Sequence, residues 1–334
     1  MFTERKRIKA HYFEIYKDKL FILEDDCSPL YVYDIHTFHL IAKLSDNYGG
    51  GLYAIKDLVV DEHLKGVNVD TLSKVPSFYN CSNTYYYITN SKYIIIRKFI
   101  TDFSLELHIV RLDNYQIVRK IKDTSGTIRL FTESNDLICS TEDFLFLYKD
   151  FTLLWQKDLS KLTQYTEWDG TEEEGKIREV YEYQDSVIVL TQMFILRIDL
   201  QTGDIIYSLQ LPAGLMELSI VGDKAYGCYG YHYMEVDIEK GKLLNFVRIE
   251  NAVYQGKEYN AIMDSPKFHE GYVFHGVRLE GGYYAISALD AQTEKRIWID
   301  LLGTYMVEKI EFYENKMFVS DSGGSLYIYE KEDA

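Results

Sequence analysis

The stretch Leu196-Arg-Ile-Asp199-Leu-Gln-Thr-Gly203-Asp-Ile-Ile-Tyr207 decides the fold of this 334-residue chain. Apolar runs of strand length flank an Asp-x-x-x-Gly segment, and this pattern is typical of two strands joined by a tight turn. The pattern returns at Met234–Asn245, with Asp237 and Gly241, and again at Ser287–Trp298, with Asp290. Looser copies are centred on other acidic residues, which are Asp34, Asp70, Asp113, Asp150 and Glu330.

These acidic positions recur at a mean spacing of about 42 residues, which is typical of the blades of a β-propeller. Between two copies the chain supplies two more strand-like runs, such as Glu179–Tyr183 and Ser186–Leu190. Each unit is therefore expected to hold four antiparallel strands. Helical periodicity is weak throughout, so we predict an all-β fold, a single β-propeller domain over residues 1–334.

The last unit ends after its third strand, residues 325–330, whereas the first unit has strand-forming sequence to spare. Residues 11–16, 19–24, 30–34 and 38–44 already supply four strands, so Phe2–Lys9 is left over. An open ring would expose unpaired strand edges. We therefore predict that Phe2–Lys9 completes the last blade and closes the ring, which brings the two termini together.

The number of blades depends on residues 45–83, where alternation is poor. If Leu52–Ala54, Leu58–Val60, Val67–Asp70 and Leu72–Val75 are short strands, the propeller has eight blades. If they form an irregular insertion, it has seven. Seven blades are preferred because the strand signals in this segment are weak.

The segment Leu289-Asp290-Ala-Gln-Thr-Glu-Lys-Arg-Ile-Trp298 resembles the repeat of the pyrroloquinoline-quinone-like propellers. Val319–Tyr327 resembles the hairpin between the second and third strands of that repeat. The resemblance implies a propeller fold. The exported quinone dehydrogenases of that superfamily carry adjacent cysteines and a calcium site, and this chain has neither pattern. We therefore expect no cofactor, and the resemblance points to the members that act as scaffolds and binding modules.

Charge and targeting signals narrow the cellular context. The formal net charge is −16, which disfavours binding to nucleic acid and to anionic membranes. No secretory signal or membrane span is evident, and the four cysteines are scattered without metal-ligand spacing. We expect a cytoplasmic protein that is monomeric on its own.

The most distinctive local feature is the acidic stretch Glu167–Gly175, which falls between a fourth strand and the next first strand. It is expected to be a loop on one rim of the propeller, together with aromatic residues from other loops of that kind. The candidate binding residues are Tyr165, Trp168, Asp169, Glu172, Glu173, Glu174, Tyr254 and Tyr259. The alternatives for this stretch are a solvated loop without a function and a site for a divalent cation.

Motifs for catalysis are missing, since the sequence has no G-x-S-x-G, no HExxH and no phosphate-binding loop. No catalytic or metal-binding residue is therefore predicted. The preferred hypothesis is a non-enzymatic propeller that holds a protein partner on an acidic, aromatic rim, for example an immunity protein that blocks a basic toxin. The alternatives are a hydrolase or lyase with a site at the axial channel, and a sensor of sugars or other small ligands.

Overall fold

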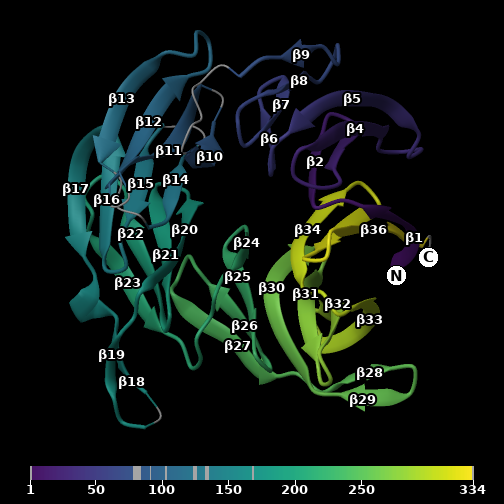
Figure 1. The fold of residues 1–334 in the computed structure, drawn as a ribbon. Coiled ribbons are helices and arrows are strands. Elements are labelled where there is room, and N and C mark those ends of the chain that lie inside the picture. Colours follow the sequence, from purple (N-terminus) through teal and green to yellow (C-terminus); the bar gives the residue numbers. More distant parts are fainter. Residues whose placement is uncertain are drawn as a thin grey trace. The chain divides into compact units, whose positions relative to one another are not determined.

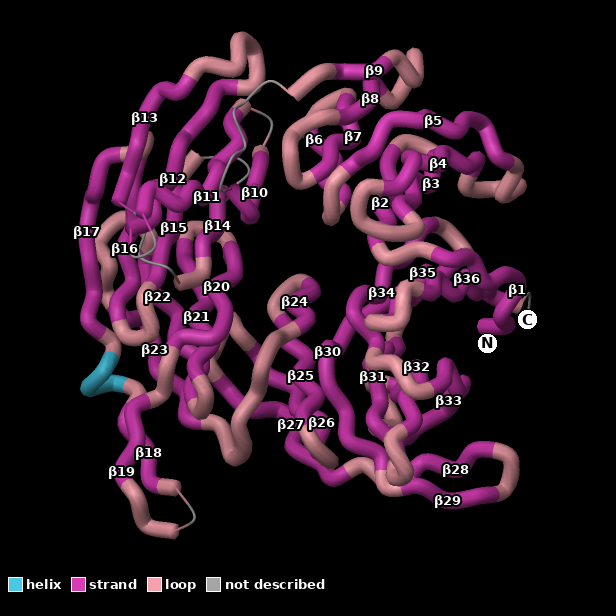
Figure 2. Tube along the Cα trace, viewed as in Figure 1, coloured by secondary structure: helices cyan, strands magenta, loops and turns pink. Residues whose placement is uncertain are grey.

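The computed structural model describes residues 2–77, 84–90, 92–101, 104–122, 126–131, 135–167 and 169–332. One short 3-10 helix, Ser160–Leu162, is the only helix in these ranges, and the other regular elements are β-strands (Figure 2). No helix in this part of the chain is long and apolar enough to cross a membrane. The chain divides into two compact units, residues 1–123 with 311–334 and residues 124–310, which are described in turn.

Unit 1 contains the N-terminal sheets and most of the last sheet (Figure 1). Its strands are β1 (Phe2–Lys9), β2 (Tyr12–Tyr16), β3 (Lys19–Leu23), β4 (Ser28–Asp34), β5 (Leu40–Tyr48), β6 (Leu52–Ile55), β7 (Leu58–Asp61), β8 (Gly66–Asn68), β9 (Lys74–Val75), β10 (Thr84–Thr89), β11 (Tyr93–Thr101), β12 (Ser104–Arg111), β13 (Ile117–Lys122), β35 (Lys316–Asp321) and β36 (Ser325–Lys331). Strand β34 (Val307–Tyr313) spans the boundary between the units.

Unit 2 contains four complete sheets and two additional hairpins. Its strands are β14 (Ile128–Leu130), β15 (Leu137–Ser140), β16 (Phe144–Lys149), β17 (Thr152–Asp158), β18 (Gln164–Thr166), β19 (Glu172–Glu174), β20 (Ile177–Tyr183), β21 (Ser186–Thr191), β22 (Phe194–Asp199), β23 (Ile205–Gln210), β24 (Ser219–Val221), β25 (Lys224–Tyr229), β26 (His232–Asp237), β27 (Lys242–Arg248), β28 (Ala252–Tyr254), β29 (Lys257–Tyr259), β30 (Ala261–His269), β31 (Tyr272–Leu279), β32 (Tyr283–Asp290) and β33 (Lys295–Gly303).

The strands form eight four-stranded antiparallel sheets in the described part of the chain, so the preference for seven blades was wrong. The additional sheet is β6-β7-β8-β9, which falls in the segment that the sequence left open. Its strands hold only two to four residues each. A strand that short has too few positions to show alternation, and this is why the sequence pattern failed there.

The prediction that Phe2–Lys9 completes the last sheet is confirmed. Strand β1 pairs antiparallel with β36, with Phe2 opposite Lys331 and Lys9 opposite Ser325. The two chain ends consequently lie beside each other (Figure 1). This pairing satisfies the outer edge of β36, which would otherwise present unpaired backbone groups to other chains.

Neighbouring sheets pack face to face within each unit. In unit 1 the last sheet packs on the first, where the Phe13 and Phe318 rings lie 6.4 Å apart. In unit 2 the sheet β14–β17 packs on β20–β23 in the same way, and β20–β23 packs on β24–β27. Strand β21 shows the consequence, because all six of its residues are buried.

Aromatic residues on the fourth strands attach one sheet to the turns of the next. Trp155 of β17 donates a hydrogen bond from Nε1 to the Leu200 carbonyl, at 3.0 Å. Tyr207 of β23 donates its hydroxyl to the Ile238 carbonyl, at 2.8 Å. Each ring lies against the glycine of the turn it reaches, and a Cβ at Gly241 would lie 2.5 Å from Tyr207 Cγ. Gly241 also has a φ of +61°, so both space and backbone conformation require glycine there.

Four of the repeated acidic residues are structural, because they cap the turns between third and fourth strands. Asp199 accepts hydrogen bonds from the backbone N–H groups of Gln201 and Thr202, at 2.9 and 2.8 Å. Asp34, Asp237 and Asp290 cap their turns in the same manner. Backbone donors hold the pKa of Asp199 below its usual value, since they stabilise the charged form. In the second sheet this position is Asn68 and not Asp70, which corrects the expected repeat by two residues.

The closing strand provides a stability test. Phe2 is buried and packs 6.2 Å from the Phe312 ring, measured between centroids. We expect Phe2→Ala to lower the free energy of unfolding by about 3 kcal/mol, because it removes a buried ring and leaves a cavity. Urea unfolding measures the change. The control is Arg5→Ala on the same strand, whose exposed ion pair with Glu330 should contribute less than about 1 kcal/mol. Equal losses of stability in the two variants would contradict the conclusion that the buried Phe2 ring anchors β1 in the last sheet.

Candidate functional site

The two ends of each sheet in unit 2 differ because each sheet is an up-and-down meander. We call one end the turn end: it carries the turns that join the first strand to the second and the third to the fourth. We call the other end the crossover end: it carries the turns between the second and third strands, and the segments that lead into the next sheet. This end corresponds to the rim on which the sequence placed the candidate binding residues.

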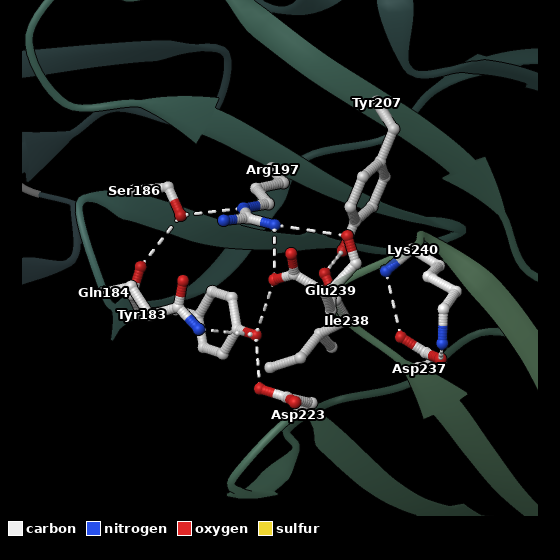
Figure 3. Close-up of polar contacts among 10 residues, drawn as sticks. All are labelled: Tyr183, Gln184, Ser186, Arg197, Tyr207, Asp223, Asp237, Ile238, Glu239 and Lys240. Carbon is white, nitrogen blue, oxygen red and sulfur yellow. Dashed lines mark hydrogen bonds and ion pairs between the residues drawn. The ribbon is translucent and has the colours of Figure 1, made fainter.

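A polar network occupies the turn end between sheets β20–β23 and β24–β27 (Figure 3). The Tyr183 hydroxyl lies 2.7 Å from Asp223 Oδ1 and 3.0 Å from Glu239 Oε2. The buried Arg197 guanidinium donates to Glu239 Oε2 from Nη1, at 2.9 Å, and to Ser186 Oγ from Nε, at 2.9 Å. Burial and the two carboxylates raise the pKa of Tyr183. The network uses its polar groups to join two sheets, which makes it a structural brace.

The crossover end of unit 2, in contrast, exposes large apolar side chains. Among the described residues of unit 2, nine exposed large apolar side chains lie at this end, and Val221 is the one at the turn end. The nine are Phe144, Leu162, Met216, Tyr229, Val253, Ile262, Tyr283, Tyr305 and Met306. The remaining exposed apolar residues of unit 2 lie on fourth strands. Exposed aromatic and apolar side chains among polar neighbours are typical of surfaces that bind proteins.

The acidic stretch predicted as a loop is a hairpin, β18–β19, that projects from the crossover end (Figure 1). Glu172, Glu173 and Glu174 form β19 and are all exposed. Glu172 accepts a hydrogen bond from Thr166 Oγ1, at 2.9 Å, whereas no ion pair involves Glu173 or Glu174 in the described part of the chain. The hairpin therefore presents carboxylates that the fold itself does not neutralise.

The other predicted residues of this stretch have different positions. Tyr165 is buried at the base of the hairpin, contrary to the surface position expected, and it packs into the core shared by β14–β17 and β20–β23. Asp169 is exposed and caps the hairpin turn by accepting a hydrogen bond from the Thr171 N–H, at 3.0 Å. Trp168 lies outside the described residues.

Tyr254 and Tyr259 lie on a second hairpin of the crossover end, β28–β29, at some distance along the chain from β18–β19. Both are half-buried, and the Lys257 Nζ lies 4.7 Å from the centroid of the Tyr259 ring. The hairpin borders a cleft of about 670 Å³ between β27 and β33, lined among others by Arg248, Glu250, Val253 and Trp298. A cleft of this volume is large enough for a small ligand.

The first strands of unit 2 bring together charged residues that the sequence did not single out. Arg129 forms an ion pair with Glu179, at 2.5 Å, and the Tyr181 hydroxyl accepts a hydrogen bond from the Leu218 N–H, at 2.7 Å. Burial raises the pKa of Glu179. Burial and the nearby Glu217 raise the pKa of Asp264. Raised carboxyl pKa values are common in functional sites, although structural clusters also show them.

A metal site was not predicted. Within the ranges that the structure describes, no three or more His, Cys, Asp or Glu side chains lie close enough together to hold a metal ion.

Comparison with known proteins identifies the fold. No protein-family model and no curated protein matches the chain. Among solved structures, the C-terminal WD40 domain of Sif2 is similar with a TM-score of 0.69 and 10% identity, over 100% of this chain and 99% of that one. BamB from Moraxella catarrhalis is similar with a TM-score of 0.66 and 10% identity, over 99% and 100%. Saccharomyces cerevisiae Sqt1 is similar with a TM-score of 0.65 and 9% identity, over 99% and 98%.

These likenesses show that the fold is an all-β propeller fold, here with eight four-stranded antiparallel blades. At 9–10% identity these likenesses show the fold and do not select one repeat family, so the resemblance to the pyrroloquinoline-quinone-like repeat stays a prediction.

The brace at the turn end yields a second prediction. We expect Arg197→Met to destabilise the chain by about 1–2 kcal/mol, because the half-exposed Glu239 would keep its charge beside Tyr183 and Asp223 without the cation. Tyr183→Phe should cost about 1–2 kcal/mol by removing the hydroxyl between the carboxylates. Urea unfolding of both variants and of the double variant gives the interaction free energy between the two side chains.

The control for this brace is Tyr283→Phe, which alters an exposed tyrosine hydroxyl at the crossover end. It should change stability by less than about 0.5 kcal/mol. If Arg197→Met proved as stable as the parent chain, or if Arg197→Met and Tyr183→Phe were strictly additive, the network would not join the two sheets.

Proposed function

We propose that this chain is a non-enzymatic protein-binding propeller that holds a basic protein partner on the acidic, aromatic crossover end of unit 2. The observation that carries the proposal is the concentration of exposed apolar side chains at that end, next to carboxylates that form no ion pair among the described residues. Apolar and aromatic residues would supply the buried anchors of an interface. The carboxylates would attract a partner of opposite charge and orient it during association.

The domain organisation, compartment and oligomeric state that we propose follow from the sequence. We propose one domain in which β1 closes a ring of eight blades, in a cytoplasmic protein that is monomeric without its partner. The net charge of −16 supports a basic protein as partner, and disfavours nucleic acid and anionic membranes. An antagonist of a basic toxin would be one such role. The enzyme and small-ligand alternatives rest on the raised-pKa carboxylates and on the cleft beside β28–β29.

Affinity capture with charge-reversed variants tests the proposal. The chain should capture a basic protein at low salt and release it at roughly 0.5 M salt, where screening shortens the range of charge attraction to a few ångströms. Glu173→Lys combined with Glu174→Lys should reduce capture at least tenfold, because it converts attraction into repulsion.

The matched control reverses two exposed carboxylates at the turn end, with Asp185→Lys and Asp204→Lys. This variant has the same net charge as the hairpin variant and should retain capture. A partner that binds all three proteins equally, with no dependence on salt, would contradict the proposed rim. If the turn-end control lost more capture than the hairpin variant, the interface would lie at the turn end and the proposal would be wrong.

A further inference from the structure

Three of the exposed apolar residues at the crossover end lie on segments that meet where sheet β30–β33 packs on β24–β27. Met216 lies before β24, Tyr229 is the last residue of β25 and Ile262 is the second residue of β30, and their exposed fractions are 47%, 45% and 40%. An antiparallel bridge between Gly230 and Met263 brings the end of β25 beside the start of β30. The turn before β24 is held over β25 because Leu215 packs against Gly227, where a Cβ would lie 2.6 Å from Leu215 Cδ1.

Two carboxylates lie among these apolar residues. Glu217 directly follows Met216, and Asp264 shares a face of β30 with Ile262 because the strand alternates. Asp264 lies over Gly276, where a Cβ would approach its Oδ1 to 2.6 Å. Only a residue without a side chain at Gly276 leaves room for this position of the carboxylate.

Neither carboxylate is neutralised within the part of the chain that the structure describes. Glu179, on the first strand β20, forms an ion pair with Arg129. The Glu217 and Asp264 carboxylates form no hydrogen bond or ion pair in the described part of the chain. Arg278 lies opposite Ile262 in the sheet and forms no ion pair with Asp264 in that part of the chain either. Desolvation by the surrounding protein and the charge of Glu217 raise the pKa of Asp264, although the residue keeps some contact with solvent.

We propose that Met216, Glu217, Tyr229, Ile262 and Asp264 form a docking patch for a basic, amphipathic segment of a partner protein. An arginine or lysine of the partner would lie between Glu217 and Asp264, and its apolar neighbours would pack on Met216, Tyr229 and Ile262. Charge complementarity selects this occupant, because a cation replaces the repulsion between the two carboxylates with two attractions. Phosphate-bearing nucleic acids and anionic lipids would add repulsion instead.

The inference rests on the proposed function and goes beyond it by giving the place and chemistry of the cation site. The β18–β19 hairpin would then act at longer range by attracting the partner, since its exposed carboxylates lie in solvent where charge interactions are weak. The docking patch would contribute the short-range contacts, because its groups are more enclosed by protein and lie beside apolar anchors.

Peptide binding tests the patch directly. The probe is a short peptide that alternates Arg and Leu, compared with a Glu–Leu peptide and with an Arg–Gly peptide of equal length. Calorimetry should detect binding of the Arg–Leu peptide, with the Arg–Gly peptide weaker and the Glu–Leu peptide not bound. Glu217→Gln combined with Asp264→Asn should weaken binding of the Arg–Leu peptide about tenfold or more. The same double variant should not lower the thermal midpoint, since it removes a repulsion.

The matched control is Asp185→Asn combined with Asp204→Asn at the turn end, which removes the same charge. This control should weaken peptide binding by less than about threefold at physiological salt. If Glu173→Lys combined with Glu174→Lys loses peptide binding while the patch variant keeps it, the docking patch is wrong and the proposed rim survives. If no basic peptide or protein binds, both proposals fail. Equal binding of the Arg–Leu and Glu–Leu peptides would also overturn the patch.

Discussion

Face-to-face packing of adjacent four-stranded sheets is the constraint on which the rest of this structure depends. It buries both faces of the middle strands, as the fully buried strands β21 and β35 show. Little room for recognition is left on those strands, so exposed side chains gather at the ends of the sheets and on the fourth strands. The repeat also makes the two ends unequal. Tight two-strand turns cover one end, whereas the other end carries the longer segments that lead from sheet to sheet.

The acidic residues at the two ends of the sheets differ in their partners. At the turn end the repeated aspartates accept backbone hydrogen bonds, and the brace around Arg197 engages Asp223 and Glu239. These carboxylates stabilise the fold and are not free to bind a partner. At the crossover end of unit 2, Glu173, Glu174, Glu217 and Asp264 lack such partners among the described residues. The acidic residues of unit 2 thus include some that cap turns or join sheets and some that have no cation partner among the described residues.

The sequence predicted what depends on local pattern. Four-stranded antiparallel units, the pairing of Phe2–Lys9 with the last sheet and the position of the acidic stretch before β20 were all readable from alternation and spacing. The sheet β6–β9 escaped notice because its strands are too short to alternate. Burial of Tyr165 depends on packing between two sheets, and the position of Asp264 near Tyr229 depends on the bridge from Gly230 to Met263. Both are long-range contacts, which a local pattern does not report. A weak signal was available, since Tyr229 and Tyr283 each adjoin a glycine of a turn between the second and third strands.

We propose the crossover end of unit 2 as the recognition surface. Hydrogen exchange of the intact chain, with and without a captured basic partner, shows which segments the partner covers. We expect slowed exchange in the segments at residues 141–144, 161–174, 211–218, 229–232 and 250–264, with the turns at residues 200–204 and 238–242 unchanged. Slowed exchange confined to those turns, or to the fourth strands, would contradict the account.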